Sequence, residues 1–222
     1  MLITLVIIGV IAALTIPNLM QKYQEQATVK KVQKFYSNVY DAYKLAVKDN
    51  GTPSEWGLTG DNQKSAKKIY EILFKPYFKI AKDCGINNTG NCIPNTMYKT
   101  IKNNGFNNYA IKPSYYKIKL EDGSSVWFRG SIDQHYDMVI FYDVNGTKEP
   151  NQWSRDLFEL NAKNDKVWPV GIPSNISLSP NSFNTHCQVT GQHCTAWVIY
   201  KGNMDYLHCD GLTWKSRSCK EK

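Results

Sequence analysis

Residues 1–31 read MLITLVIIGVIAALTIPNLMQKYQEQATVKK, an apolar run followed by the first charged residues of the chain. Residues 1–20 carry no charge. At a rise of about 1.5 Å per residue, a helix of this length matches the ~30 Å hydrocarbon core of a bilayer. The first charged residue is Lys22, so no basic region precedes the apolar run, whereas a secretory signal peptide begins with one. We therefore expect residues 1–20 to form the membrane-embedded half of a long helix.

Residues 21–50 are expected to continue the same helix in amphipathic form. Apolar residues recur there at three- and four-residue steps with lysines between them, which is the period of a helix with one apolar face. The pattern ends at Gly51, a residue suited to a left-handed C-cap, and at Pro53, which cannot continue a helix. The apolar stripe consists of Val32, Tyr36, Val39, Tyr43 and Ala46, with Phe35 and Tyr40 beside it.

The remaining residues, 51–222, are expected to form one α+β globular domain. The whole chain has 222 residues, a mean hydropathy of −0.46 and no second uncharged run near the ~18 residues of a membrane span, which excludes a multi-pass membrane protein. The net charge is +8, but the lysines are scattered among acidic residues. This distribution favours a solvated lysine-rich surface over a nucleic-acid or lipid-binding patch.

Within this domain, a second helix is predicted first and antiparallel strands afterwards. Residues 62–85 have a helical apolar stripe that extends to Ile80, with a kink or break expected at Pro76 and a stop at Gly85. From residue 114 the apolar period shifts toward two, and Asp122-Gly123 predicts a hairpin turn. A long helix followed by antiparallel strands is typical of the α+β class. The predicted strand segments are 114–130, 136–146 and 155–160, with an exit loop at 167–173. The tail, 194–219, adds a short apolar run, a Gly-Asn turn and three cysteines.

The chain has six cysteines, all outside the uncharged run. An even set behind an apolar anchor favours disulfides in an oxidising compartment, which places the domain outside the cytoplasm. We expect pairing between sequence neighbours, because short loops close at modest entropic cost. The main alternative is a Cys194–Cys209 bridge around a hairpin, which would leave Cys187 and Cys219 to pair. The expected pairs are Cys84 with Cys92, Cys187 with Cys194, and Cys209 with Cys219.

Two groups of residues contain side chains that can bind metal ions. Three His-Cys dipeptides lie within residues 186–209, but their spacing is not that of common zinc sites, and disulfides are the favoured interpretation. Asp143 and Asn145 precede Gly146, with Asp156 further on, and alternating oxygen ligands around a turn suit Ca²⁺. Position 12 counted from Asp143 is Ser154 instead of an acid. The alternative is a hairpin turn in which Asp143 and Asn145 cap the backbone.

The segment LITLVIIGVIAALTIPNLM resembles the N-terminal segment of type IV pilins and of type II secretion pseudopilins. The resemblance covers residues 1 to about 49 and includes the spacing of Gly9 and Pro17 and the amphipathic continuation. It implies a long helix packed on a small antiparallel sheet. In that family a basic leader ending in Gly is cut off before a Phe or Met, which is then N-methylated, and a glutamate usually follows shortly after. Leader, cleavage site and glutamate are absent here, and we expect them to precede Met1.

The resemblance implies a structural subunit of a type IV pilus or a type II secretion pseudopilus. Its implied partners are the cytoplasmic membrane, other pilin or pseudopilin subunits, the prepilin peptidase and the assembly machinery. Its implied location is a single-pass membrane protein with the domain outside the cytoplasm, in a periplasmic or cell-surface filament. Some pseudopilins hold a structural calcium ion in a loop of the domain, and no other cofactor is implied.

Two other functional classes are considered. A minor or tip pilin would bind DNA, a glycan or a secreted substrate, and a membrane-tethered extracytoplasmic enzyme would need catalytic residues. No GxSxG, HExxH or P-loop motif occurs, so no enzyme is expected. Aromatic residues beside basic ones could stack on single-stranded nucleic acid, but such aromatics belong more often to a core, so nucleic acid is not an expected partner. These groups are Trp127, Phe128 and Arg129, and Trp214, Lys215 and Arg217.

Overall fold

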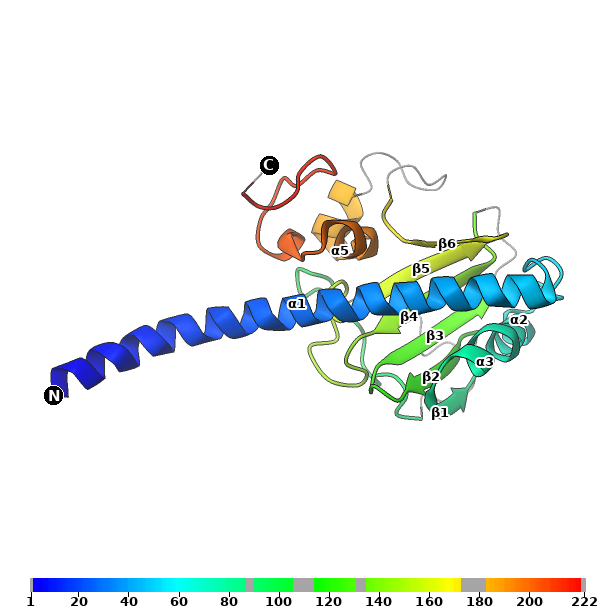
Figure 1. Ribbon diagram of the computed structural model, residues 1–222, viewed down its shortest axis with the longest axis horizontal. Helices are drawn as coiled ribbons and strands as arrows, with labels where there is room; N and C mark the ends of the chain where they lie inside the picture. Colours follow the sequence, from blue (N-terminus) through cyan, green and yellow to red (C-terminus); the bar gives the residue numbers. More distant parts are fainter. Residues whose placement is uncertain (1, 87–89, 106–113, 131–134, 173–182, 221–222) are drawn as a thin grey trace.

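The computed structural model describes residues 2–86, 90–105, 114–130, 135–172 and 183–220, with the side chains of the first helix described from Ile7 onward. It has an α+β architecture, in which one long helix packs along a six-stranded antiparallel sheet (Figure 1). This confirms the fold class expected from the sequence.

The long helix, α1 (Leu2–Asn50), continues through Pro17 without interruption. Its first half projects away from the domain, and its second half lies along the sheet (Figure 1). The first buried apolar residue of α1 is Val29, which is 1% exposed, and the buried stripe ends at Ala46. Gly51 ends the helix with φ +76°, a left-handed conformation that glycine adopts without steric cost.

The sheet is a simple meander, since each strand pairs antiparallel with the next one in sequence. The predicted hairpin turn is present at Asp122-Gly123, where Gly123 has φ +85° and its N–H donates to Leu120 O. The strands are β1 (Ile80–Gly85), β2 (Tyr116–Leu120), β3 (Ser125–Gly130), β4 (Met138–Asp143), β5 (Leu157–Lys163) and β6 (Lys166–Pro169).

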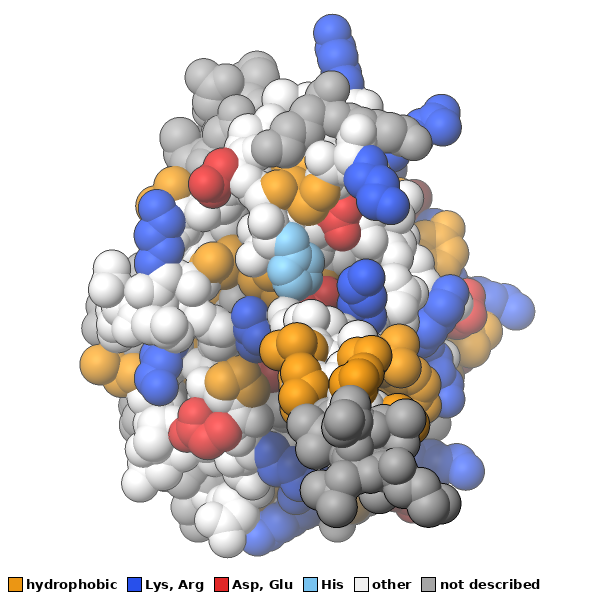
Figure 2. Space-filling model, turned by 90° about the vertical axis from the view of Figure 1, so that its left-hand side faces the viewer, with side chains coloured by type: hydrophobic (Ala, Val, Ile, Leu, Met, Phe, Trp, Pro, Cys, Tyr) orange, Lys and Arg blue, Asp and Glu red, His pale blue; other side chains and the backbone are white. Residues whose placement is uncertain are grey.

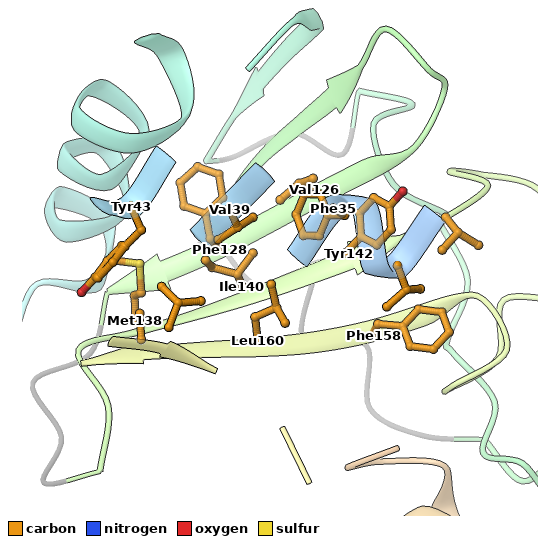
Figure 3. Packing of buried hydrophobic residues seen from close by; sticks show 14 of the residues in the cluster. Phe35, Val39, Tyr43, Val126, Phe128, Met138, Ile140, Tyr142, Phe158 and Leu160 are labelled. Carbon is orange, nitrogen blue, oxygen red and sulfur yellow. The ribbon is translucent and has the colours of Figure 1, made fainter. Parts of the chain in front are cut away.

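Both faces of the central strands are buried, which explains why β4 reads as a continuous apolar run, MVIFYD. Its alternate residues Met138, Ile140 and Tyr142 face α1 in the main core (Figure 3). Val139 and Phe141 face the opposite side, in a second apolar cluster with Trp127, Trp153 and Tyr98. The sheet is therefore a layer between α1 and a smaller core formed by loops.

The contact between α1 and the sheet is aromatic at its centre. The ring of Phe35 stacks on the ring of Tyr142 with centroids 3.9 Å apart and planes 5° from parallel (Figure 3). Further along α1, Tyr43 is buried and its hydroxyl donates to Asn164 O at 2.8 Å, beyond the end of β5. The helix axis is thus fixed at two points of the sheet.

The second predicted helix is shorter than the sequence pattern suggested. It consists of α2 (Asn62–Ile69), a π-helical turn η1 (Tyr70–Phe74) and α3 (Lys75–Tyr77), and Ile80 belongs to β1 instead. The π turn explains the break, because Lys75 N–H bonds to Tyr70 O in a wider turn directly before Pro76, which has no N–H. Ile80 then pairs with Leu120 of β2, and this pairing satisfies its backbone in the sheet.

The apolar run of the tail, to which the sequence pattern assigned no element, forms helix α5 (Thr195–Lys201). This helix packs against α1 and ends at Gly202 with φ +70°. Burial explains this outcome, since Ala196, Trp197 and Val198 are fully buried on consecutive positions beside the sheet. Short helical turns flank α5: η3 (Phe183–Cys187), α4 (Gln188–Thr190) and η4 (Asp205–Leu207).

Three disulfides connect sequence neighbours, as the spacing predicts: Cys84–Cys92, Cys187–Cys194 and Cys209–Cys219. The alternative bridge between Cys194 and Cys209 is not formed. The loops span 7 to 10 residues, and two of the three lie in the region after β6 that has little regular structure. The disulfides indicate folding in an oxidising compartment, outside the cytoplasm.

Replacing Phe35 by Ala should remove the central contact of the core. We expect a loss of about 3 to 5 kcal/mol in the free energy of unfolding, because a buried aromatic side chain is lost and a cavity remains. Urea unfolding followed by circular dichroism measures this. Lys30→Ala, on the exposed face one turn earlier, should change the free energy by less than about 0.5 kcal/mol. Equal losses for the two variants would contradict the packing described.

Replacing Cys209 and Cys219 together by Ser should lower the free energy of unfolding by about 2 to 3 kcal/mol, the value expected when a loop of this length is no longer closed in the unfolded chain. Urea unfolding of the double variant against wild type measures it. Non-reducing peptide mapping provides the independent check. A peptide that joins Cys194 to Cys209 would contradict the pairing.

Candidate functional site

The first candidate site is the projecting half of α1, whose apolar side chains have no cover from the described part of the chain. Every large apolar side chain described between Ile7 and Tyr23 is more than half exposed, and Leu19 reaches 69%. Viewed toward this half of the molecule, apolar side chains gather on the helix, whereas Lys and Arg side chains spread over the face around it (Figure 2). An apolar surface of this extent on a soluble domain marks a binding or membrane surface.

The domain holds α1 where the helix leaves it. The ammonium of Lys31 donates to Val144 O at 3.0 Å, and the amide of Gln33 donates to Ile199 O at 3.1 Å. Further toward the projecting half, the imidazole of His208 lies 2.8 Å from the carboxylate of Glu25. The loop after β4 and the C-terminal region thus both form polar contacts with the helix from residue 25 onward.

The second candidate site is the β4–β5 loop, which contains the three residues proposed for calcium. The structure brings them together. The carboxylate of Asp143 accepts bonds from Asn145 N at 3.0 Å and Gly146 N at 2.8 Å, and its other oxygen accepts a bond from the hydroxyl of Tyr98. The amide of Asn145 donates to Asp156 Oδ1 at 3.2 Å.

Burial raises the pKa of both carboxyl groups of this network, Asp143 and Asp156. Desolvation raises the pKa of Asp143 to about 8, although bonds from Tyr98 and from backbone N–H groups oppose the shift. Desolvation also raises the pKa of Asp156 to about 6. The pKa of the Tyr98 hydroxyl lies well above its ordinary value, because the ring is buried and the carboxylate of Asp143 is adjacent.

A calcium site needs several oxygen atoms that are close together and free to bind the ion. Asp143, Asn145 and Asp156 are adjacent, but both oxygens of Asp143 already accept hydrogen bonds, and Asn145 turns its NH₂ group toward Asp156. Among the described residues, no group of three or more Asp, Glu, His or Cys side chains is arranged to hold a metal ion. In this arrangement Asp143 acts as the cap of the β4 turn.

The other residue groups singled out in the sequence are structural. Trp127 and Phe128 are 1% and 0% exposed in the two cores, so their faces are not open to a nucleic-acid base. The ring of Trp214 packs on Trp197 and Phe183, while Lys215 and Arg217 are exposed beside it.

The cysteines of the three His-Cys dipeptides are all disulfide-bonded and are therefore not available as zinc ligands. Two of the neighbouring histidines, His186 and His193, stack on each other with ring centroids 4.7 Å apart. The third, His208, contacts Glu25 instead.

Several contacts at these sites could not be found in the sequence. Tyr98 precedes its partner Asp143 by 45 residues, and His208 follows Glu25 by 183 residues. No local spacing or motif connects residues so far apart. Of the two candidate sites, the apolar run of α1 could be predicted from the sequence, because it is continuous along the chain.

Comparison with known protein families matches residues 18–167, more than half of the chain, to a family of unknown function (DUF6613). The chain belongs to this family. In this DUF6613 protein the matched segment begins within the projecting half of α1 and ends in β6. The family description assigns no activity. No curated protein and no solved structure matches the chain.

Among the residues that the structure describes, no helix combines the length and the apolar character needed to cross a membrane.

The raised pKa values of Asp143 and Asp156 predict that stability falls as the pH rises. Each folded-state pKa exceeds the ordinary 3.8, so the folded state favours the protonated form. The associated stability is complete below about pH 4 and is lost as the pH rises toward about 8, by at most ~1.4 kcal/mol per pH unit for each group. Asp143→Asn should reduce this decline in urea unfolding series from pH 4 to pH 8.

Asp41→Asn, an exposed change on α1, is the matched control and should keep the wild-type pH dependence. Calcium provides a further arm. If Ca²⁺ binds at Asp143, adding it at pH 8 should stabilise the wild type but not the Asp143→Asn protein. A wild type with flat stability across this pH range, without added calcium, would contradict the buried-carboxyl description.

Proposed function

We propose that this protein is a structural subunit of a type IV pilus or of a type II secretion pseudopilus, held in the cytoplasmic membrane and then assembled through its N-terminal helix. The observation that carries the proposal is the division of α1 into two halves. The second half is buried against the sheet, and the first half projects with its apolar side chains exposed. The resemblance of residues 1–49 to pilins supports the same function.

The proposed membrane anchor is the uncharged run of residues 1–20. The side chains of residues 1–6 lie outside the described part of the structure, so the support for these six residues of the anchor comes from the sequence. An uncharged run of about 20 residues suffices to cross a bilayer as a helix. The three disulfides agree with a domain on the extracytoplasmic side of such an anchor.

Assembly follows from the same surface. On leaving the lipid, the projecting half of α1 would expose its apolar side chains to water, at a cost of about 25 cal/mol for each Å². Packing against equivalent helices of other subunits removes this cost and drives filament formation. The subunit needs no cofactor and no catalytic group for this role. The prepilin peptidase and the assembly machinery are the expected partners.

The pair Ile8→Asp and Lys30→Glu tests this function. Ile8 is 64% exposed in the projecting half, and a charge there would cost about 2.5 to 3.5 kcal/mol at the centre of a bilayer. We expect Ile8→Asp to lose both membrane retention and filaments, measured by membrane fractionation and by electron microscopy of sheared filaments from cells that express the full chain.

Lys30→Glu lies on the exposed face of the packed half and serves as the matched control. It should leave both measurements near wild type, because its side chain faces water. Filaments and membrane retention that survive Ile8→Asp would contradict the proposed function. A folded domain in both variants, checked by circular dichroism, ensures that the loss comes from the projecting helix.

A further inference from the structure

The chain contains three Asn-Gly dipeptides, and the structure describes all of them. In such a dipeptide the backbone nitrogen of the glycine and the side-chain amide of the asparagine belong to one short segment, and the glycine has no Cβ to hinder their approach. Attack of this nitrogen on the amide carbon releases ammonia, so each dipeptide is a chemical target within the chain itself. The three lie at residues 50–51, 104–105 and 145–146.

In the dipeptide 145–146, the attacking nitrogen is bonded to a carboxylate. The N–H of Gly146 donates to Asp143 Oδ1 at 2.8 Å. A general base lies within about 2.6 to 3.2 Å of the atom whose proton it takes, so Asp143 is in position to accept the proton of Gly146. In the part of the chain that the structure describes, the N–H groups of Gly51 and Gly105 donate to no carboxylate.

Asp143 is a stronger base than an ordinary capping aspartate, as a second turn in the same chain shows. Asp61 caps α2 by accepting bonds from the N–H groups two and three residues later, and these bonds, that from Lys64 first, lower the pKa of its exposed carboxyl group. Asp143 accepts bonds from N–H groups at the same two positions. It is fully buried, however, and desolvation raises its pKa to about 8. A pKa near the working pH is the one that suits a general base.

The group that would leave is held by the second buried carboxyl group. The side-chain NH₂ of Asn145 donates to Asp156 Oδ1 at 3.2 Å and to Glu149 O at 3.3 Å, which fixes the orientation of the amide. Asp156 is 4% exposed. Asn145 and Asp156 also line a cavity of about 370 Å³, which has room for the water that hydrolysis needs.

We infer that Asn145 is a site of self-catalysed deamidation, in which the nitrogen of Gly146 attacks the side-chain carbonyl carbon of Asn145 while Asp143 takes the proton of that nitrogen. A bond forms between Gly146 N and Asn145 Cγ, and the bond from Cγ to the NH₂ group breaks. Ammonia leaves with one proton more than the NH₂ group had, which balances the proton lost by Gly146. Water then opens the cyclic imide to aspartate or isoaspartate, so water is the only co-reactant.

The product changes the charge of the β4–β5 loop. Position 145 would carry a carboxylate in place of a neutral amide, beside the carboxyl groups of Asp143 and Asp156. The same loop contacts α1, since Val144 O accepts a bond from the ammonium of Lys31. The modification would therefore add a negative charge where the long helix leaves the domain. The inference does not depend on the proposed filament function, because every group that takes part belongs to this loop.

The test follows deamidation of the folded full chain in detergent micelles at pH 8, by peptide mapping and mass spectrometry. We expect Asn145 to react at least about tenfold faster than Asn104, although Asn104 is the more exposed of the two, because a positioned general base accelerates a reaction by about a hundredfold or more. In denaturing urea the two asparagines should react at similar rates, since each is then an Asn-Gly dipeptide in an unfolded chain.

Asp143→Asn removes the base and keeps the shape of the side chain. It should slow the reaction at Asn145 about a hundredfold at pH 8 and leave the rate at Asn104 unchanged. Asp41→Asn, an exposed change on α1, is the matched control and should react as wild type at both positions. Urea unfolding curves establish that each variant is folded.

Two results would overturn the inference. If Asn145 reacts no faster than Asn104 in the folded wild type, Asp143 serves only as the cap of its turn. If a folded Asp143→Asn protein deamidates at Asn145 at the wild-type rate, the carboxylate is not the base. The first comparison is made within one wild-type chain, so it decides the question even if the Asp143→Asn protein does not fold.

Discussion

The burial of the second half of α1 on the sheet is the contact on which the rest of the molecule depends. Most of the stability of a helix in a protein comes from packing its apolar face against other elements. The position of the 49-residue helix α1 is therefore set by the surface against which it packs. Here the stripe from Val29 to Ala46 meets the apolar face of β3, β4 and β5, with Phe35 stacked on Tyr142 at the centre. Each such side chain contributes about 1.5 to 3 kcal/mol when fully buried.

This contact also determines what remains exposed. The buried stripe of α1 begins at Val29, and the large apolar side chains described from Ile7 to Tyr23 are all more than half exposed. The first half of α1 extends beyond the sheet (Figure 1). The same division separates a self-contained domain from a segment that needs a partner or a membrane, which is the physical basis for the proposed filament subunit.

Polar groups concentrate at the end of the domain where α1 leaves it. The strands of the meander bring the β4–β5 loop to this end, and the C-terminal region joins it through Tyr206, whose hydroxyl donates to Ser154 O at 2.7 Å. Buried carboxyl groups in this loop oppose stability at neutral pH unless a ligand or a proton compensates them. The disulfides restrain the flanking loops, where regular hydrogen bonding is sparse.

The elements with a strong local pattern were predictable from the amino-acid sequence: the long helix, its end at Gly51, the β2–β3 hairpin and the neighbour disulfides. These depend on local spacing, since apolar period, turn residues and loop length are all set within a few residues. Local spacing was misleading where tertiary contacts competed with it. Ile80 continued a helical stripe but pairs with Leu120 in the sheet. The run after Cys194, for which no element was predicted, forms α5, in which three consecutive residues are buried.

The surroundings of the candidate sites were not predictable in this way, because they depend on the folded chain. The sequence placed Asp143, Asn145 and Asp156 near one turn. The hydroxyl that donates a hydrogen bond to the Asp143 carboxylate belongs to Tyr98, in a loop 45 residues earlier in the chain. The contact of His208 with Glu25 joins α1 to the C-terminal region of the chain. The burial and the charge partners of a side chain depend on residues that are far apart in sequence, so no local pattern along the chain predicts them.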